Sequence, residues 1–257
     1  MYIKSNTMKK LIYLFCISLV LVSCEKNEDD TKDICTANCT TLRGKFVTAN
    51  NVPLANITVE LKYEIGGGGF GGGSTRKIVR TKSNQNGEYN RDFYVKDNEL
   101  GNLASGYFTI NIDDSKLSSN NYIKLGNNHS LGYAIYSIGR RDTIIDESFY
   151  IPKKAFIKVN LNNYIPQKEG DRFEVQTLFP FGPKVGMNTF LNSEYATGFS
   201  GYDKFKAVNL NNKLNVLVAE SEKNIVRVIS VKNGIASSID YEINVPPNNT
   251  IELTYNY

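Results

Sequence analysis

Alternation of apolar and polar side chains with a period of two is the feature that most constrains the fold of this chain. Residues 57–64 carry an apolar side chain at every second position with polar side chains between them, and residues 108–112 repeat the pattern. This alternation is typical of strands that cover a core with one face and meet water with the other. Residues 25–257 contain no helical stripe of comparable length. Short strands with frequent Asn and Gly turns therefore predict an all-β chain made of antiparallel β-sandwiches.

The strands fall into two consecutive blocks, residues 42–150 and 151–257. Ile151–Lys154 is interpreted as a hinge between them. The second block opens with alternation over residues 157–161 and ends with inward-facing apolar positions from Ile251 to Tyr257. Asn233-Gly234 separates two apolar runs and predicts a hairpin with a type I′ turn. Since the second block has the usual size of one domain, we expect two tandem β-sandwich domains.

Motifs of the first block carry a family resemblance. Gly44–Val47, Val52–Val59, the turn Ser83–Tyr89 and the strand Gly106–Ile110 resemble a carboxypeptidase regulatory-like (transthyretin-like) domain. In the turn, Ser83-Asn84 replaces the Thr-Asp that is usual in the family. The resemblance covers roughly residues 42–113. It implies a transthyretin-like or Ig-like sandwich that serves as a structural and interaction module without a catalytic centre of its own.

Two residues of these motifs have a clear conformational role. Pro53 presets φ in the turn between the first two strands, and Gly87 allows positive φ in the next turn. Tyr89 is then expected to begin a strand and fill the core.

The N-terminus has a short apolar run between a basic start and a cysteine. The apolar run 11–22 would be about 18 Å long as a helix, too short for the ~30 Å of a bilayer core. Met8-Lys9-Lys10 precedes it, and Leu21-Val22-Ser23-Cys24 closes it in the manner of a bacterial lipobox. This arrangement resembles a lipoprotein signal peptide. The resemblance implies removal of residues 1–23 and attachment of palmitate and further acyl chains to Cys24, which anchors the chain in the lipid bilayer. The alternative is an ordinary secreted protein in which Cys24 is incidental.

Residues 24–41 are predicted to be the lipidated cysteine and a flexible tether, because residues 25–33 contain no apolar side chain. Lys26 followed by acids is similar to the signal that sends some Gram-negative lipoproteins to the outer face of the outer membrane. Asn27 interrupts that pattern, and a simple spacer is the alternative. We therefore expect an outer membrane lipoprotein, with exposure at the cell surface left open.

The net charge and the cysteines limit the partners and metal sites that can be expected. Removing the three lysines of residues 1–23 lowers the formal net charge from +4 to +1, so nucleic acid is not an expected partner. Cys35 and Cys39 of an exported chain favour a local disulfide worth roughly 2 kcal/mol, with pairing to another protein as the alternative. A structural zinc site needs four ligands, and the single histidine, His129, is distant in sequence. No metal and no cofactor are predicted.

Two shorter features are less specific. Asp142-Thr143-Ile144 is similar to the sequence at which some bacterial exported proteins are O-glycosylated, which makes Thr143 a candidate, although so short a motif also arises by chance. The glycine-rich insertion Gly66–Ser74 lacks the Lys-Ser/Thr of a phosphate-binding loop and predicts a flexible hairpin tip with Phe70 on it.

A segment of nearly 30 residues before Phe205 is the predicted binding surface. Loops of that length in compact domains tend to be functional, and exposed aromatic side chains suit recognition. The alternative is that the rings fold back and cap the sandwich. The candidate side chains are Phe179, Phe181, Phe190, Tyr195, Phe199 and Tyr202.

An enzyme is not expected. A nucleophile needs a positioned base, and the chain has one histidine and no Gly-x-Ser-x-Gly elbow. Only carboxylates remain as candidates: Asp142, Asp146, Glu147, Glu169 and Asp171. The sequence predicts a membrane-anchored, non-enzymatic lipoprotein that acts as a cell-envelope interaction or adhesion module for a protein or glycan. The alternative is a periplasm-facing structural accessory of an outer-membrane uptake or secretion complex.

Overall fold

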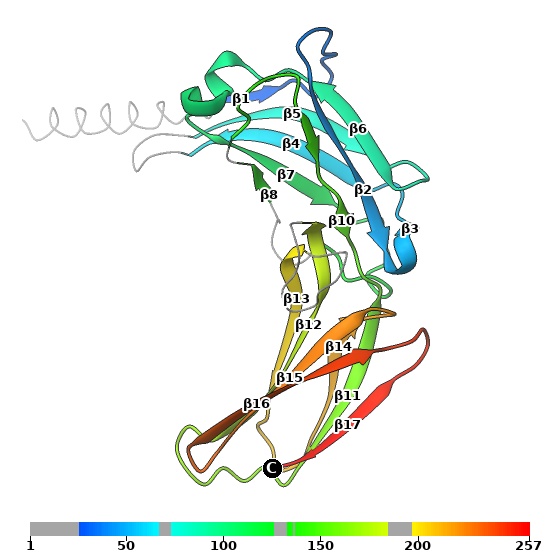
Figure 1. Ribbon diagram of the computed structural model, residues 1–257, viewed down its shortest axis with the longest axis vertical. Helices are drawn as coiled ribbons and strands as arrows, with labels where there is room; N and C mark the ends of the chain where they lie inside the picture. Colours follow the sequence, from blue (N-terminus) through cyan, green and yellow to red (C-terminus); the bar gives the residue numbers. More distant parts are fainter. Residues whose placement is uncertain (1–25, 67–72, 126–132, 136, 185–196) are drawn as a thin grey trace, which may run out of the picture.

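The computed structural model describes residues 26–66, 73–125, 133–135, 137–184 and 197–257 (Figure 1). These residues form strands joined by turns and three short 3-10 helices: Ala49–Asn51, Asp97–Glu99 and Gly101–Leu103. In the part of the chain that the structure describes, no helix is long and apolar enough to span a bilayer. The prediction of an all-β chain is confirmed.

The first half of the chain is a sandwich of two sheets. Its first sheet has the order β1-β5-β4-β7-β8, and in its second sheet β2 pairs antiparallel with β6 and parallel with β9 and β10. The alternating residues of β4 and β7 face the core between the sheets, where Ile57, Leu61 and Ile110 are fully buried, as predicted. The strands are β1 (Lys26–Asp29), β2 (Thr40–Thr48), β3 (Val52–Pro53), β4 (Thr58–Ile65), β5 (Ser74–Lys82), β6 (Glu88–Phe93), β7 (Tyr107–Asp113), β8 (Tyr133–Ile135), β9 (Ile144–Asp146) and β10 (Phe149–Tyr150).

The turn before β6 has the predicted geometry. Gly87 has a φ of +74°, and a Cβ atom there would lie 2.5 Å from the carbonyl oxygen of Phe46. Both the conformation and the close approach therefore require glycine. Tyr89 follows in β6 and is buried in the core, as expected.

The second half is a second sandwich. One sheet has the order β13-β12-β15-β16, and the facing sheet has the order β14-β11-β17. The alternation predicted at the start and end of this half is confirmed in β11 and β17. Asn233 and Gly234 have φ values of 55° and 82°, as a type I′ turn requires. The strands are β11 (Lys154–Asn162), β12 (Arg172–Lys184), β13 (Thr197–Lys206), β14 (Asn212–Ala219), β15 (Lys223–Lys232), β16 (Ile235–Asn244) and β17 (Ile251–Asn256).

The two halves repeat one strand topology. In the first half β2 pairs antiparallel with β6 and parallel with β9, just as β11 pairs antiparallel with β14 and parallel with β17 in the second. Likewise β4 lies between β5 and β7, and β7 pairs with β8, just as β12 lies between β13 and β15, and β15 pairs with β16. All of these latter pairs are antiparallel. The repetition was not predicted from the sequence.

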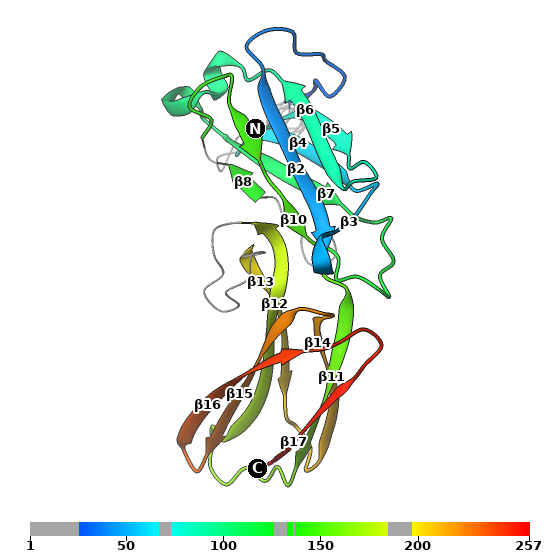
Figure 2. The same cartoon turned by 45° about the vertical axis from the view of Figure 1, so that its right-hand side comes forward.

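A shared sheet joins the halves. Phe149 of β10 pairs with Phe46 of β2 on one side and with Pro183 of β12 on the other, which makes a nine-stranded sheet. Figures 1 and 2 show an elongated molecule with β10 and the upper part of β12 where the halves meet. Phe181 from β12 packs into the core of the first half.

The hinge interpretation of Ile151–Lys154 is wrong. Ile151 and Pro152 are buried. The N–H of Ile151 donates to the carbonyl of Val47 at 2.9 Å, and the N–H of Lys154 donates to the carbonyl of Asn121 at 2.8 Å. Backbone that is buried and hydrogen-bonded in this way is held in place, since breaking those bonds would leave polar groups unsatisfied.

Candidate interaction surface

Strand β16 is the outermost strand of its sheet and is exposed along almost its whole length. Its sheet has four strands in the second half, and the facing sheet has three. The exposed fractions of Ile235, Ile239 and Tyr241 are 75%, 53% and 39%. These side chains point to the same face of the strand, on which Ser237 lies between Ile235 and Ile239, and they form a mostly apolar row.

This row is the uncovered continuation of the core. Ile239 lies directly opposite Val228 of β15, and Tyr241 lies opposite Val226. Directly opposed residues share a face of the sheet, and both valines are buried in the core of the second half. The side chains of the row therefore point to the same side of the sheet as the core residues, but they are exposed.

Strand β17 forms the other side of this open end. Its inward-facing Leu253 and Tyr255 are only partly buried. The rings of Tyr241 and Tyr255 have centroids 6.5 Å apart, and partial burial raises the pKa of Tyr255 to about 12, with a further contribution from Tyr241. Strand β17 pairs with β11 along one side, and no other described strand pairs with its opposite side. The edges of β16 and β17 thus lie on either side of the partly exposed end of this core.

The turn geometry tells which backbone groups of β16 are free. In a two-residue turn the carbonyl of Lys232 accepts the N–H of Ile235. Because antiparallel neighbours alternate between bonded and non-bonded pairs, Ile235 and every second residue after it direct their N–H and C=O groups toward β15. The intervening residues direct theirs to the open edge, where no other described strand lies. These residues are Ala236, Ser238, Asp240 and Glu242.

The outer face of β16 is polar and paired within its own sheet. Arg227 of β15 donates to both carboxylate oxygens of Asp240 at 2.8 Å, and this contact lowers the pKa of that carboxyl. Lys223 pairs with Glu242 at 2.6 Å. Natural edge strands are usually protected by a proline, a bulge or an inward-facing charge. Strand β16 contains no proline or lysine, and its pairing with β15 is continuous.

The aromatic surface predicted from the sequence is wrong for two of its members. Phe179 and Phe181 are 1% and 7% exposed and belong to the core of the first half, so these rings are buried, but they do not cap the second sandwich as the alternative expected. Phe190 and Tyr195 lie outside the described residues. Phe199 and Tyr202 lie in β13, and their backbones pair with Phe181 and Leu178. Most of the predicted loop is a long hairpin of β12 and β13.

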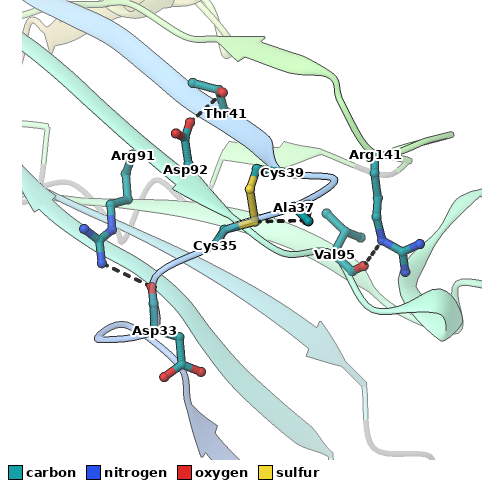
Figure 3. The surroundings of a disulfide bond; sticks show 9 residues. All are labelled: Asp33, Cys35, Ala37, Cys39, Thr41, Arg91, Asp92, Val95 and Arg141. Atoms are coloured by element: carbon teal, nitrogen blue, oxygen red, sulfur yellow. Dashed lines mark hydrogen bonds between the residues drawn. A yellow bond between two sulfur atoms is a disulfide. The ribbon is translucent and has the colours of Figure 1, made fainter.

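The predicted local disulfide is formed. Cys35 and Cys39 are bonded, with their Cα atoms 5.8 Å apart (Figure 3). Nearby, Arg91 donates to the carbonyl of Asp33 at 3.3 Å. The bond closes a small loop immediately before β2 and beside β6.

The other predicted residues that the structure describes make contacts with their own surroundings. The hydroxyl of Thr143 is half-buried and donates to the carbonyl of Arg140 at 2.9 Å. Asp146 pairs with Arg43 at 2.9 Å, and the Asp171 carboxylate accepts backbone N–H groups. Among the described residues, no group of three or more His, Cys, Asp or Glu could hold a metal ion. Cys24, Phe70 and His129 lie outside the described residues.

A hollow of about 430 Å³ lies beside the N-terminal segment and contains the buried Arg76. Burial opposes the charge on this guanidinium, but Glu99 and Asp30 favour it more, and the pKa of Arg76 is raised. Because both carboxylates already contact Arg76, the hollow offers a poor site for an external anion. The exposed β16 remains the stronger candidate.

No family model and no curated protein matches the chain. Three solved structures are similar: the Bacillus anthracis TIE protein, a streptococcal ancillary pilin and the shaft pilin SpaA from Lactobacillus rhamnosus GG. Their identities are 12%, 9% and 7%, and their TM-scores are 0.29, 0.29 and 0.30. The matches cover 85%, 86% and 85% of this chain and 33%, 63% and 97% of those chains, so this chain spans about a third of the first and under two thirds of the second. TM-scores below 0.5 do not establish a common fold.

Proposed function

We propose that this chain is a membrane-anchored, non-enzymatic lipoprotein of the cell envelope that binds a partner protein by β-strand addition. The observation that carries the proposal is the open edge of β16 with its exposed apolar row. An extended peptide bonded to Ala236, Ser238, Asp240 and Glu242 would continue the sheet. Every second side chain of that peptide would lie on the same face of the sheet as the apolar row. Evenly spaced backbone groups along an apolar row suit a polypeptide better than a glycan.

The anchor supports the same function. The lipobox resemblance implies acyl chains on Cys24, and more than one chain holds a protein stably in a bilayer. Cys24→Ala should abolish labelling with palmitate and release the protein from membranes. A variant that stays membrane-bound and labelled would contradict this part of the proposal.

The repeated topology extends the family interpretation. The resemblance to carboxypeptidase regulatory-like domains covers only the first half. Since the second half has the same strand order and directions, we interpret both halves as domains of this transthyretin-like type. Such domains serve as interaction modules, which agrees with a binding role. The envelope face remains part of the proposal, and protease accessibility on intact cells distinguishes a surface module from a periplasm-facing accessory.

Hydrogen exchange tests the binding edge residue by residue. In the free protein the amides of Ala236, Ser238, Asp240 and Glu242 should exchange quickly, while the amides between them, bonded to β15, should be protected. Photo-crosslinking through an unnatural amino acid at Ser238 in the native envelope identifies the partner. On binding of that partner, the fast amides should become protected. A bound complex in which they still exchange quickly would refute strand addition.

A matched pair of variants tests the backbone contact itself. Ser238→Pro removes an N–H that points to the open edge, where proline is tolerated, and it should weaken partner binding at least about tenfold, or ~1.4 kcal/mol. Ser238→Ala keeps the N–H and should bind as the wild-type protein does. Protection of the amides bonded to β15 verifies that both variants fold. Equal binding by the two variants would contradict the proposal.

A further inference from the structure

We infer that the first sandwich lies directly against the bilayer, with the end at which β1 begins facing the lipid headgroups. The inference rests on the proposed acylation of Cys24. The sequence predicted a flexible tether over residues 24–41. The structure instead makes the part from Lys26 onward a portion of the folded sandwich. The occupant of this surface is the lipid bilayer itself.

Strand β1 places the N-terminal segment in the first sheet. Lys26 pairs with Ser74 and Asp29 pairs with Lys77, in parallel along the outer edge of β5. The N–H of Asp30 donates to the carbonyl of Lys77 at 2.8 Å, which extends the pairing by one residue. The tether prediction is therefore wrong from Lys26 onward.

Ion pairs link this strand and the residue after it to the rest of the first sandwich. Asp30 contacts the buried guanidinium of Arg76 at 2.8 Å, and Arg76 also pairs with the buried Glu99. Glu28 pairs with Lys96. Detaching β1 would remove one of the two carboxylates that balance a buried charge, and such changes are unfavourable.

The rest of the segment is held as well. Arg91 donates to the carbonyls of Thr31 and Asp33. The Cys35–Cys39 bond follows, and β2 begins at Thr40 (Figure 3). Between Lys26 and the first residue of β2, the chain thus has repeated attachments and does not act as a long spacer.

The remaining connection is short. Cys24 precedes Lys26 by two positions, which span at most about 7 Å of extended chain. The headgroup layer of a bilayer is itself only several ångströms thick. An acylated Cys24 would therefore hold the paired residues Lys26 and Ser74 at the headgroup boundary.

The chemistry of this end suits contact with headgroups. Ile65 pairs with Ser74, and Glu64 pairs with Tyr107, so β4, β5 and β7 meet there with the start of β1. Figure 1 shows these strand ends together on the left side of the first sandwich. Ile65, Ser74 and Tyr107 are uncharged and partly exposed, and tyrosine is enriched at membrane interfaces.

Single-tryptophan reporters test the placement, because the chain contains no tryptophan. Gly66 is exposed and follows Ile65, and a Cβ atom there meets nothing within 4 Å, so Gly66→Trp should fold normally. Strand spacing puts it roughly 10 Å from Lys26. Val52→Trp, on the exposed strand β3 at the right-hand side of the first sandwich in Figure 1, is the matched control. Each lipidated full-length protein is placed in phosphatidylethanolamine–phosphatidylglycerol vesicles with a spin-labelled headgroup.

Quenching of Gly66→Trp should exceed that of Val52→Trp by at least about threefold. Inserting 12 Gly/Ser residues after Cys24 adds a linker of roughly 20 Å and should abolish the difference. Equal quenching of the two reporters, or quenching of Gly66→Trp that survives the insertion, would overturn the inference. Protein that fails to float with the vesicles would instead contradict acylation of Cys24, and the inference with it.

Discussion

Phe179→Ala is the sharpest test of how the two halves are joined. Phe179 belongs to β12 of the second half, yet its ring is 1% exposed within the core of the first. Complete burial of such a ring contributes ~1.5–3 kcal/mol by transfer alone, and the cavity left by truncation adds to the loss. Phe→Ala changes in cores typically cost ~3–5 kcal/mol. For a chain of this size, each kcal/mol corresponds to roughly 2–4 °C in melting temperature.

We therefore expect the free energy of unfolding to fall by about 3–5 kcal/mol and the melting temperature to fall by roughly 6–20 °C. The measurements are urea unfolding followed by far-UV circular dichroism, and calorimetry, on the soluble chain that begins at Glu25. Phe156→Ala is the matched control, because Phe156 lies on β11 with its ring exposed. That variant should lose about 1 kcal/mol or less.

A loss below about 1 kcal/mol for Phe179→Ala would refute the reasoning. It would mean that the ring lies at the surface, as the aromatic recognition surface predicted from the sequence requires. Two separate unfolding transitions with only the second half destabilised would refute the shared core in a different way.

Three further changes have defined outcomes. Arg76→Met leaves the buried Glu99 without its charge partner and should destabilise the fold by ~3–5 kcal/mol, and Arg76→Met with Glu99→Leu should recover most of that loss in urea unfolding. Cys35→Ser with Cys39→Ser should cost about 2 kcal/mol, and dithiothreitol should have the same effect on the wild-type protein and none on the variant. Burial opposes ionisation of Asp171, but N–H groups from Gln167, Lys168, Gly234 and Asn233 outweigh it and hold the pKa of its carboxyl below 3.8. The ionised Asp171 carboxylate should therefore stabilise the fold fully above pH 3.8, and this stabilisation should be lost as the pH falls through the lower folded-state pKa. The NMR chemical shift of the Gly234 amide, which donates to this carboxylate, reports that pKa. The stability of Asp171→Asn should lack this pH dependence.

Local chemistry in the sequence was sufficient to predict those strands and turns that depend on neighbouring residues alone. The alternation around Ile57 marks a buried face because a strand turns successive side chains to opposite sides, and Ile57 is fully buried. Asn233-Gly234 predicts its hairpin because both residues tolerate positive φ. Each of these inferences depends only on residues that are neighbours along the chain.

The same local rules misread segments whose structure depends on distant partners. Lys26–Asp29 has no apolar side chain, but β5 supplies backbone partners and Arg76 supplies a charge partner. The prolines and glycines around Phe181 indicated a loop, although β12 and β13 form a hairpin there. The matching topology of the two halves is invisible in the sequence, because strand order is a property of pairing.

The candidate interaction surface shows this division most clearly. Ile235, Ile239 and Tyr241 lie an even number of positions apart in the sequence, as buried residues of one strand face do. By itself the sequence determined that they share one face of a strand. Whether a second sheet covers that face depends on how many strands the second sheet contains, and here it contains three against four. The tertiary structure alone decided that these side chains are exposed, because burial depends on what lies across from a strand and not on the strand's own pattern.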